Sequence, residues 1–121
     1  MIPPQRSIEP HDLARKVALL AEDKKAADII VLDVAGLTTI AEAFVICTGG
    51  SEPQLAAITA NIVDGMAAEG VTPAHRHRAP SPHWIVLDYG SVIVHVFTPP
   101  EREFYKLEQL WASAKVLLSI Q

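Results

Sequence analysis

The chain has little of what secreted and membrane proteins require. Its only cysteine is Cys47, so an internal disulfide cannot form and a disulfide-stapled scaffold is excluded. No apolar run approaches the ~20 residues that a membrane-spanning helix needs, and the run from Val92 to Phe97 is interrupted by His95. Residues 1–4 lack the basic segment and apolar segment of a secretory signal. We therefore expect a cytoplasmic protein that makes no contact with membranes.

An excess of positive charge is also missing. The formal net charge is -4, and residues 1–60 hold 5 Lys and Arg against 8 Asp and Glu, while residues 61–121 hold 5 against 6. A protein that binds the phosphate backbone of a nucleic acid normally presents a basic surface. If this chain meets a nucleoprotein particle, we expect it to touch protein and to make little direct contact with nucleic acid.

The composition is that of one compact domain. The chain has 121 residues, of which 50% are hydrophobic and 20% charged, which suits a single hydrophobic core. Residues 1–9 are polar and contain proline, so we expect a flexible N-terminal tail there and a single domain over residues 10–121.

The first half of the chain alternates between helical and strand patterns. Helical apolar spacing runs over residues 10–25 and again over 51–70. The second of these segments opens with a capping box in which Ser51 caps and Gln54 reaches back. Between the helices, residues 29–34 and 44–47 are apolar at consecutive positions, which is typical of strands buried on both faces.

The second half predicts a hairpin and a closing helix. Residues 83–88 and 92–97 form two strand patterns joined by a short glycine-containing turn, and residues 71–78 are a candidate edge strand. A capping box at 98–101 is expected to open a helix that continues as an amphipathic helix over 112–120. The interleaved order predicts an α/β fold with a mixed β-sheet of about five strands flanked by helices.

Histidines raise the question of a metal site. His75, His77 and His83 lie beside a proline-rich segment without a nearby thiolate or carboxylate, whereas a catalytic zinc site needs three ligands on a rigid scaffold. Surface histidines are the favoured interpretation, and no metal is expected. His95 differs because it interrupts an apolar strand. It is either a core histidine hydrogen-bonded to a neighbour or part of a binding surface.

The turn Gly49–Ser51, between a strand and a helix, is the candidate for nucleotide binding. A helix N-terminus can hold a phosphate, and a glycine-serine turn is also found in nucleotidyltransferases. Those enzymes need paired carboxylates for magnesium, but the chain has no Asp-x-Asp, and its only Glu-x-Glu, Glu101 and Glu103, lies far downstream. Glu52 would also repel a phosphate. A structural turn without a cofactor is favoured, and a nucleotide-binding or nucleotidyltransferase-like enzyme is the alternative.

Nucleophilic catalysis has no support in the sequence. Cys47 ends an apolar strand, where a cysteine is by default a small buried hydrophobic residue. The chain has no Gly-x-Ser-x-Gly motif. We therefore expect no enzymatic activity.

The predicted hairpin carries two large aromatic side chains. Strand alternation places Trp84 and Asp88 on one face and Tyr89 on the other. Trp and Tyr are common anchors of protein interfaces, and both rings can equally complete a core. A binding surface and a core position both remain open.

The hairpin and the segment after it resemble a known family. Trp84–Phe97, with the sequence WIVLDYGSVIVHVF, and Arg102–Trp111, with REFYKLEQLW, are similar to the ribosomal silencing factor family, also called the Iojap-related family. Asp28–Val34 and Phe44–Gly49 match it upstream in the expected order. The resemblance covers about residues 10–112.

This resemblance carries expectations about fold and function. It implies a mixed-sheet domain of nucleotidyltransferase-like shape that lacks catalysis and often forms homodimers. It implies binding to ribosomal protein fourteen of the large ribosomal subunit, a steric block of association with the small subunit, and repression of translation. The contact residues that it suggests are Trp84, Asp88, Tyr89, His95 and Tyr105.

Overall fold

The computed structural model of the chain describes residues 8–78 and 82–121, and it describes the backbone but not the side chains of residues 76–78. Most of the tail expected over residues 1–9 lies outside the described residues. Ile8 packs against the main core, and the Glu9 carboxylate accepts a hydrogen bond from the Asp12 amide at 3.3 Å. The last two residues of the expected tail are therefore part of the folded structure.

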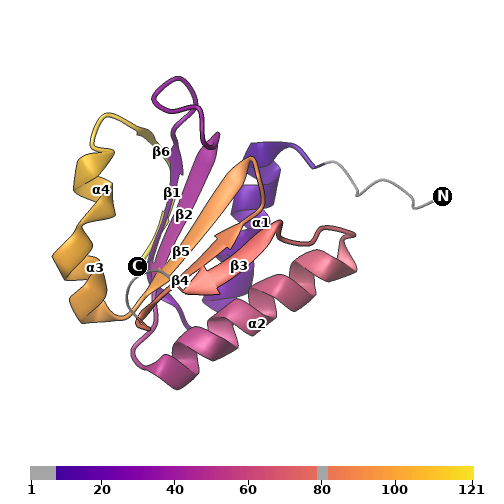
Figure 1. The fold of residues 1–121 in the computed structure, drawn as a ribbon, viewed down its shortest axis with the longest axis vertical. Coiled ribbons are helices and arrows are strands. Elements are labelled where there is room, and N and C mark those ends of the chain that lie inside the picture. The colour runs from indigo at the N-terminus through magenta and orange to yellow at the C-terminus, as the bar shows by residue number, and fades with distance from the viewer. Residues whose placement is uncertain (1–7, 79–81) are drawn as a thin grey trace.

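The fold is a mixed β-sheet flanked by helices (Figure 1). In chain order its elements are α1 (Pro10–Asp23), β1 (Ala27–Asp33), β2 (Ala43–Thr48), α2 (Glu52–Ala68), β3 (His75–Arg78), β4 (Trp84–Asp88), β5 (Val92–Phe97), α3 (Pro99–Tyr105), α4 (Leu107–Leu110) and β6 (Lys115–Ile120). The six strands lie in the order β3-β4-β5-β2-β1-β6. The pair β2–β5 is parallel and the other pairs are antiparallel. The predicted α/β class is confirmed, and the sheet has one strand more than the expected five.

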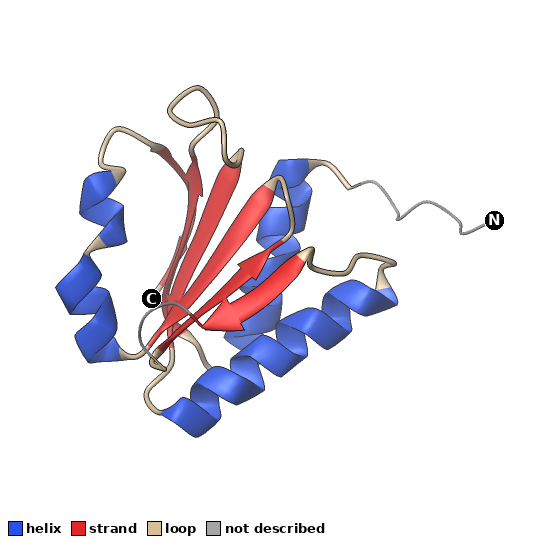
Figure 2. Ribbon diagram, viewed as in Figure 1, coloured by secondary structure: helices blue, strands red, loops and turns tan. Residues whose placement is uncertain are grey.

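The main core lies between the sheet and the pair α1 and α2, which cover one face (Figure 2). The apolar stripe of α2 is buried as its spacing predicts, at Leu55, Ile58, Ile62 and Met66. In the middle of the sheet, β2 is buried at every position. Its continuous apolar sequence follows from this placement, because a central strand covered on both faces has no side that water can reach.

The opposite face of the sheet is covered only in part. A second core forms there under α3 and α4, and its buried members are Leu32, Val34, Ala41, Phe44, Ile46 and Phe97. In Figure 2, α3 and α4 stand beside the edge of the sheet formed by β1 and β6, whereas α2 runs along the lower right beside β3. Among the described helices, α3 and α4 are the ones that pack on this second face.

The two expected capping boxes have different outcomes. The Ser51 hydroxyl accepts a hydrogen bond from the Gln54 amide at 3.3 Å, and Gln54 Oε1 accepts one from the Gly50 amide at 2.6 Å. The first box is thus confirmed, although Gln54 reaches one residue further back than expected. The prediction at Thr98 was wrong, because its side chain makes no capping hydrogen bond to α3. The prolines Pro99 and Pro100 occupy the first helical positions and have no amide hydrogen to offer.

The expected long C-terminal helix is also wrong. Lys106 has φ 48°, in the left-handed region, and this residue separates α3 from the short α4. After Trp111 the chain turns and residues 115–120 become β6, an edge strand antiparallel to β1. Apolar spacing alone did not distinguish helix from strand in this short segment. The unpaired backbone groups along the open edge of β1 favour a strand there.

Candidate docking face

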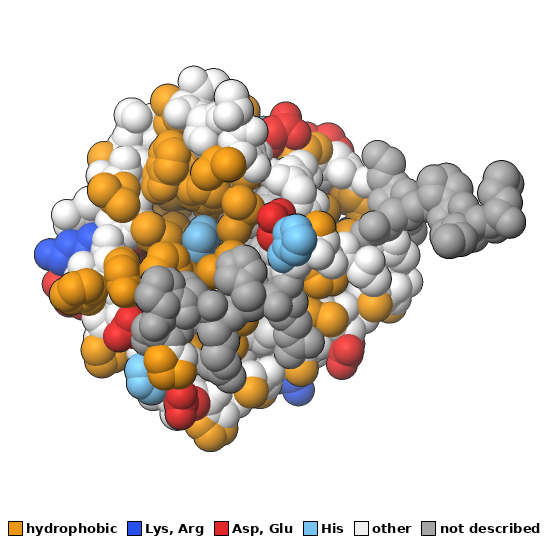
Figure 3. Space-filling model, viewed as in Figure 1, with side chains coloured by type: hydrophobic (Ala, Val, Ile, Leu, Met, Phe, Trp, Pro, Cys, Tyr) orange, Lys and Arg blue, Asp and Glu red, His pale blue; other side chains and the backbone are white. Residues whose placement is uncertain are grey.

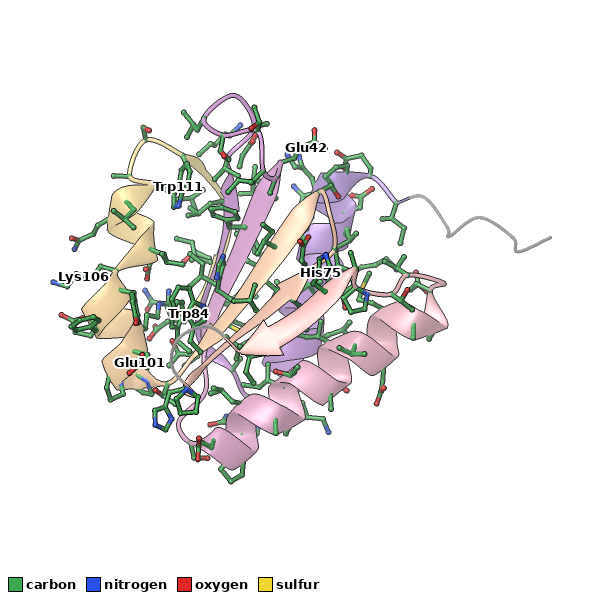
Figure 4. The ribbon with its side chains drawn as sticks, in the orientation of Figure 1. Glu42, His75, Trp84, Glu101, Lys106 and Trp111 are labelled. Atoms are coloured by element: carbon green, nitrogen blue, oxygen red, sulfur yellow. The ribbon has the colours of Figure 1, made fainter. Side chains whose placement is uncertain are left out.

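Trp84 lies at the centre of an aromatic cluster on the partly covered face. Its ring centroid is 4.8 Å from that of Phe97 and 4.6 Å from that of Tyr105. Trp84 and Tyr105 are both half-buried, so the cluster is joined to the core and still reaches the surface. Figure 4 shows Trp84 and Trp111 on the side of the sheet that faces α3 and α4.

His95 extends this cluster along β5. The Trp84 Nε1–H donates a hydrogen bond to His95 Nδ1 at 3.2 Å, which fixes the proton of the neutral imidazole on Nε2. His95 Nε2 is buried and has no hydrogen-bond partner among the described residues. Burial lowers the pKa of His95 from 6.5 to about 4, so this side chain is neutral near pH 7. The interpretation as a core histidine bonded to a neighbour is confirmed, and its neighbour is the candidate contact residue Trp84.

The lowered pKa of His95 predicts acid sensitivity. Well above pH 6.5 the His95 ring is neutral in both the folded and the unfolded chain, so the free energy of unfolding does not depend on it. As the pH falls from 6.5 towards 4, His95 binds a proton in the unfolded chain but stays neutral in the folded chain. The free energy of unfolding should then fall by up to about 3 kcal/mol. Urea denaturation between pH 7 and pH 5 measures the upper part of this loss.

The matched control for this experiment is His95→Asn. The Asn Oδ1 can accept the Trp84 Nε1–H in place of Nδ1, and the amide does not titrate. This variant should lose much of the pH dependence between pH 7 and pH 5. An unchanged slope in His95→Asn would assign the acid sensitivity to other groups.

Two further aromatic residues connect His95 to α4. The ring of Phe44 meets His95 edge-to-face at 5.4 Å, and it meets Trp111 in the same way at 5.2 Å. Sequence reasoning placed Phe44 in a buried strand and Trp111 on a helix, but it did not bring either one to the site. No spacing rule links positions so distant in sequence, because the parallel pairing of β2 with β5 creates the contact.

The structure brings three of the five candidate residues into one contact group and places the others at the far end of β4. Asp88 shares the face of Trp84 by strand alternation, and its Oδ1 accepts a hydrogen bond from the Gly90 amide at 2.7 Å. Tyr89 is half-buried and packs against the main core on the other face. Trp84, His95 and Tyr105 therefore form the contact group, Asp88 lies on the same face at the other end of β4, and Tyr89 packs on the opposite face.

The Gly49–Ser51 turn is occupied by structural contacts. A Cβ on Gly49 would lie 2.8 Å from Leu55 Cδ1, so the glycine allows α2 to approach the end of β2 closely. The Gly50 amide already donates to Gln54 Oε1. These contacts support the structural interpretation of the turn, because an amide that cradles a phosphate must be available to it.

Among the described side chains, the other candidate reactive groups do not gather into one site. Cys47 is buried, and burial raises the pKa of its thiol to about 12, with the Arg102 charge lowering it only partly. A thiol with so high a pKa is a poor nucleophile at neutral pH. Among the side chains that the structure describes, no group of three His, Cys, Asp or Glu gathers to hold a metal. His75 lies on β3 and His83 Nδ1 is 3.6 Å from Glu52 Oε1, while the His77 side chain lies outside the description.

Fold and face together define an α/β domain with an apolar, aromatic surface suited to recognition. Within residues 8–78 and 82–121, no helix is long and apolar enough to cross a membrane. A family model described as "Ribosomal silencing factor during starvation" matches residues 6–121. The chain belongs to the ribosomal silencing factor family.

Named relatives and solved structures agree with this membership. The chain is 39% identical over 100 residues to the ribosomal silencing factor RsfS of Bacillus subtilis, covering 82% of this chain and 85% of that protein. It is 38% identical over 101 residues to the chloroplastic protein Iojap of Arabidopsis thaliana, covering 84% of this chain and 42% of that protein. The bacterial relative is named as a ribosomal silencing factor, and the name of the plant protein gives its organelle.

The fold is shared with crystal structures of bacterial proteins. A protein from Chromobacterium violaceum superposes with a TM-score of 0.82 at 30% identity, covering 87% of this chain and 88% of that one. A protein from Bacillus halodurans superposes with a TM-score of 0.74 at 29% identity, covering 92% and 98%. The mixed sheet is thus the fold of this family.

Proposed function

We propose that this protein binds the large ribosomal subunit and thereby silences translation. Its target is ribosomal protein fourteen of that subunit, on the surface that the small subunit must meet. The mechanism is steric, because a protein bound there keeps the two subunits apart. Membership in the ribosomal silencing factor family supports this proposal.

The observation that carries the proposal is the aromatic face around Trp84. In Figure 3 hydrophobic side chains lie beside a histidine near the middle of the view, and the Lys and Arg side chains that are visible on this face lie at its left and lower margins. Large aromatic rings that are rigidly packed yet reach the surface are frequent anchors in protein interfaces. The face suits a protein partner better than a phosphate backbone, which would require basic groups at the contact.

The proposed contacts follow the hairpin from end to end. Trp84, His95 and Tyr105 form the aromatic centre, and Asp88 adds a carboxylate on the same face. Tyr89 follows β4 and packs against the main core on the other face, so we propose that it contacts the partner only at the edge of the hairpin turn. We further propose that the protein acts in the cytoplasm, makes little contact with ribosomal RNA, forms homodimers when free and has no enzymatic activity.

Subunit joining tests the proposed function directly. Purified small and large subunits are mixed with and without the protein, and association is followed by light scattering. The protein should inhibit association when it is added first and should have much less effect on subunit pairs that are already joined. Normal association at a several-fold excess of protein over large subunits would contradict the proposed function.

A further inference from the structure

The loop between β1 and β2, residues 34–42, exposes two large hydrophobic side chains. Leu37 is 45% exposed and Ile40 is 62% exposed. Apolar residues are common on protein surfaces one at a time, whereas a pair on one short loop invites a functional explanation. Sequence reasoning treated residues 36–41 as a plain connection and assigned no role to them.

This loop is held in place by its own hydrogen bonds. The Ala35 amide donates to Asp33 Oδ1 at 3.0 Å, and the Ile40 amide donates to Thr38 Oγ1 at 3.2 Å. The Leu37 amide donates to the Val34 carbonyl at 3.0 Å. The exposed side chains are therefore presented from a fixed backbone, which lowers the conformational entropy lost when a partner binds.

The loop belongs to the same side of the sheet as the aromatic cluster. Its flanking residues Val34 and Ala41 are buried in the second core, together with Phe44. The Glu42 amide donates to the Ser91 carbonyl at 2.8 Å, which fastens the loop to the turn of the β4–β5 hairpin. In Figure 3 hydrophobic side chains continue from the top of the sheet, beside this loop, to the histidine in the middle.

Two acidic residues lie near the loop. Glu42 is exposed at the base of the loop (Figure 4), and Asp88 is half-buried on the neighbouring hairpin. Lys115 lies at the same end of the sheet, in register with Asp33, and the Lys and Arg side chains that are visible in Figure 3 lie at the margins of that view. A partner that fits this end of the face has an apolar centre with Lys or Arg beside it, because opposite charges across an interface favour docking.

We infer that residues 34–42 form the second half of the docking face, with Leu37 and Ile40 as anchors against a basic, apolar-centred protein surface. This inference rests on the proposed function, because the partner is the same ribosomal protein that the Trp84 cluster contacts. The two halves lie at opposite ends of β4 and β5. Contact at both ends fixes the orientation of the bound protein and with it the position of the steric block.

The test is a double variant, Leu37→Ser with Ile40→Ser, measured for its Kd for purified large subunits. Loss of two anchors should weaken binding about tenfold or more. The matched control is Leu19→Ser, because Leu19 is 57% exposed on α1, which covers the opposite face. The control should bind as the wild type does. Thermal melting should change little in all of these variants, since exposed side chains contribute little to folding.

The outcomes separate the loop from the proposed function. If the wild type binds and the double variant binds as tightly as Leu19→Ser, the inference about the loop is wrong and the proposed function stands. If the wild type does not bind large subunits, both are wrong. Should the double variant melt early, Ile40→Ser alone replaces it, with weaker binding expected and unchanged binding again contradicting the inference.

Discussion

Replacement of Trp84 by alanine is expected to weaken binding to the large ribosomal subunit by a factor of about thirty or more. A central interface aromatic commonly contributes ~2 kcal/mol or more to binding, which corresponds to that factor. The ring also organises its surroundings, since it stacks on Phe97, packs at a tilt against Tyr105 and donates a hydrogen bond to His95. The measurement is the Kd for purified large subunits at fixed ionic strength.

The same packing means that the alanine variant also loses stability. Its free energy of unfolding should fall by about 2–3 kcal/mol, because a half-buried indole leaves the aromatic cluster. Met66→Ala is the matched control: Met66 lies on α2 and is fully buried in the main core on the other face, and its truncation costs a similar amount. Met66→Ala should bind normally below its melting temperature. Equal loss of binding in both variants would show that Trp84 acts through the fold alone.

A second large effect, on the free energy of unfolding, is expected when Arg102 is replaced. Its side chain links α3 to the sheet by hydrogen bonds. Its Nε donates to Glu108 Oε1 at 2.7 Å, and its Nη1 donates to Thr48 Oγ1 at 2.9 Å and to the Asp28 carbonyl. The side chain is only 14% exposed. Arg102→Met should lower the free energy of unfolding by roughly 3 kcal/mol, because it leaves a carboxylate and a carbonyl without their donor. Urea denaturation measures the loss.

The control for Arg102 is the exposed cation on the same short segment. Lys106 Nζ lies 3.5 Å from Glu103 Oε1, with the two side chains 48% and 82% exposed. Lys106→Met should change stability by less than about 1 kcal/mol, as for exposed ion pairs generally. Arg102→Lys should recover only part of the loss, because an ammonium cannot reproduce the planar guanidinium fork. A change of under 1 kcal/mol in Arg102→Met would contradict this role.

Much of the fold follows from short-range signals. The stripe of α2, the central strand β2 and the hairpin of β4 and β5 all appear where apolar spacing and turn residues predict them. The C-terminal segment does not, because its pattern satisfies both a helix and a strand. Its state is decided by the open edge of β1, which lies more than 80 residues earlier in the chain. The local sequence does not reveal that this segment pairs with so distant a strand.

The candidate site, like the fold, is predicted from the sequence only in part. Alternation along β4 correctly separates Trp84 and Asp88 from Tyr89, whose ring packs against the main core. The bond between Trp84 and His95 follows from the register of β4 against β5, which the sequence does not state. Whether these residues touch the ribosome stays a prediction of the proposed function.

The order of the helices and strands along the chain also has a consequence for the time at which the protein can act. The buried members of the main core all precede Phe97, whereas Tyr105, Trp111 and β6, which packs against that core from the edge of the sheet, come from the end of the chain. Because a chain emerges from the ribosome N-terminus first, the nascent protein can bury its first layer before the second is made. A product that stops after Phe97 would expose the edge of β1 and lack Tyr105 and Trp111 of the aromatic cluster. If the protein silences translation as proposed, that activity requires the whole chain to have been synthesised.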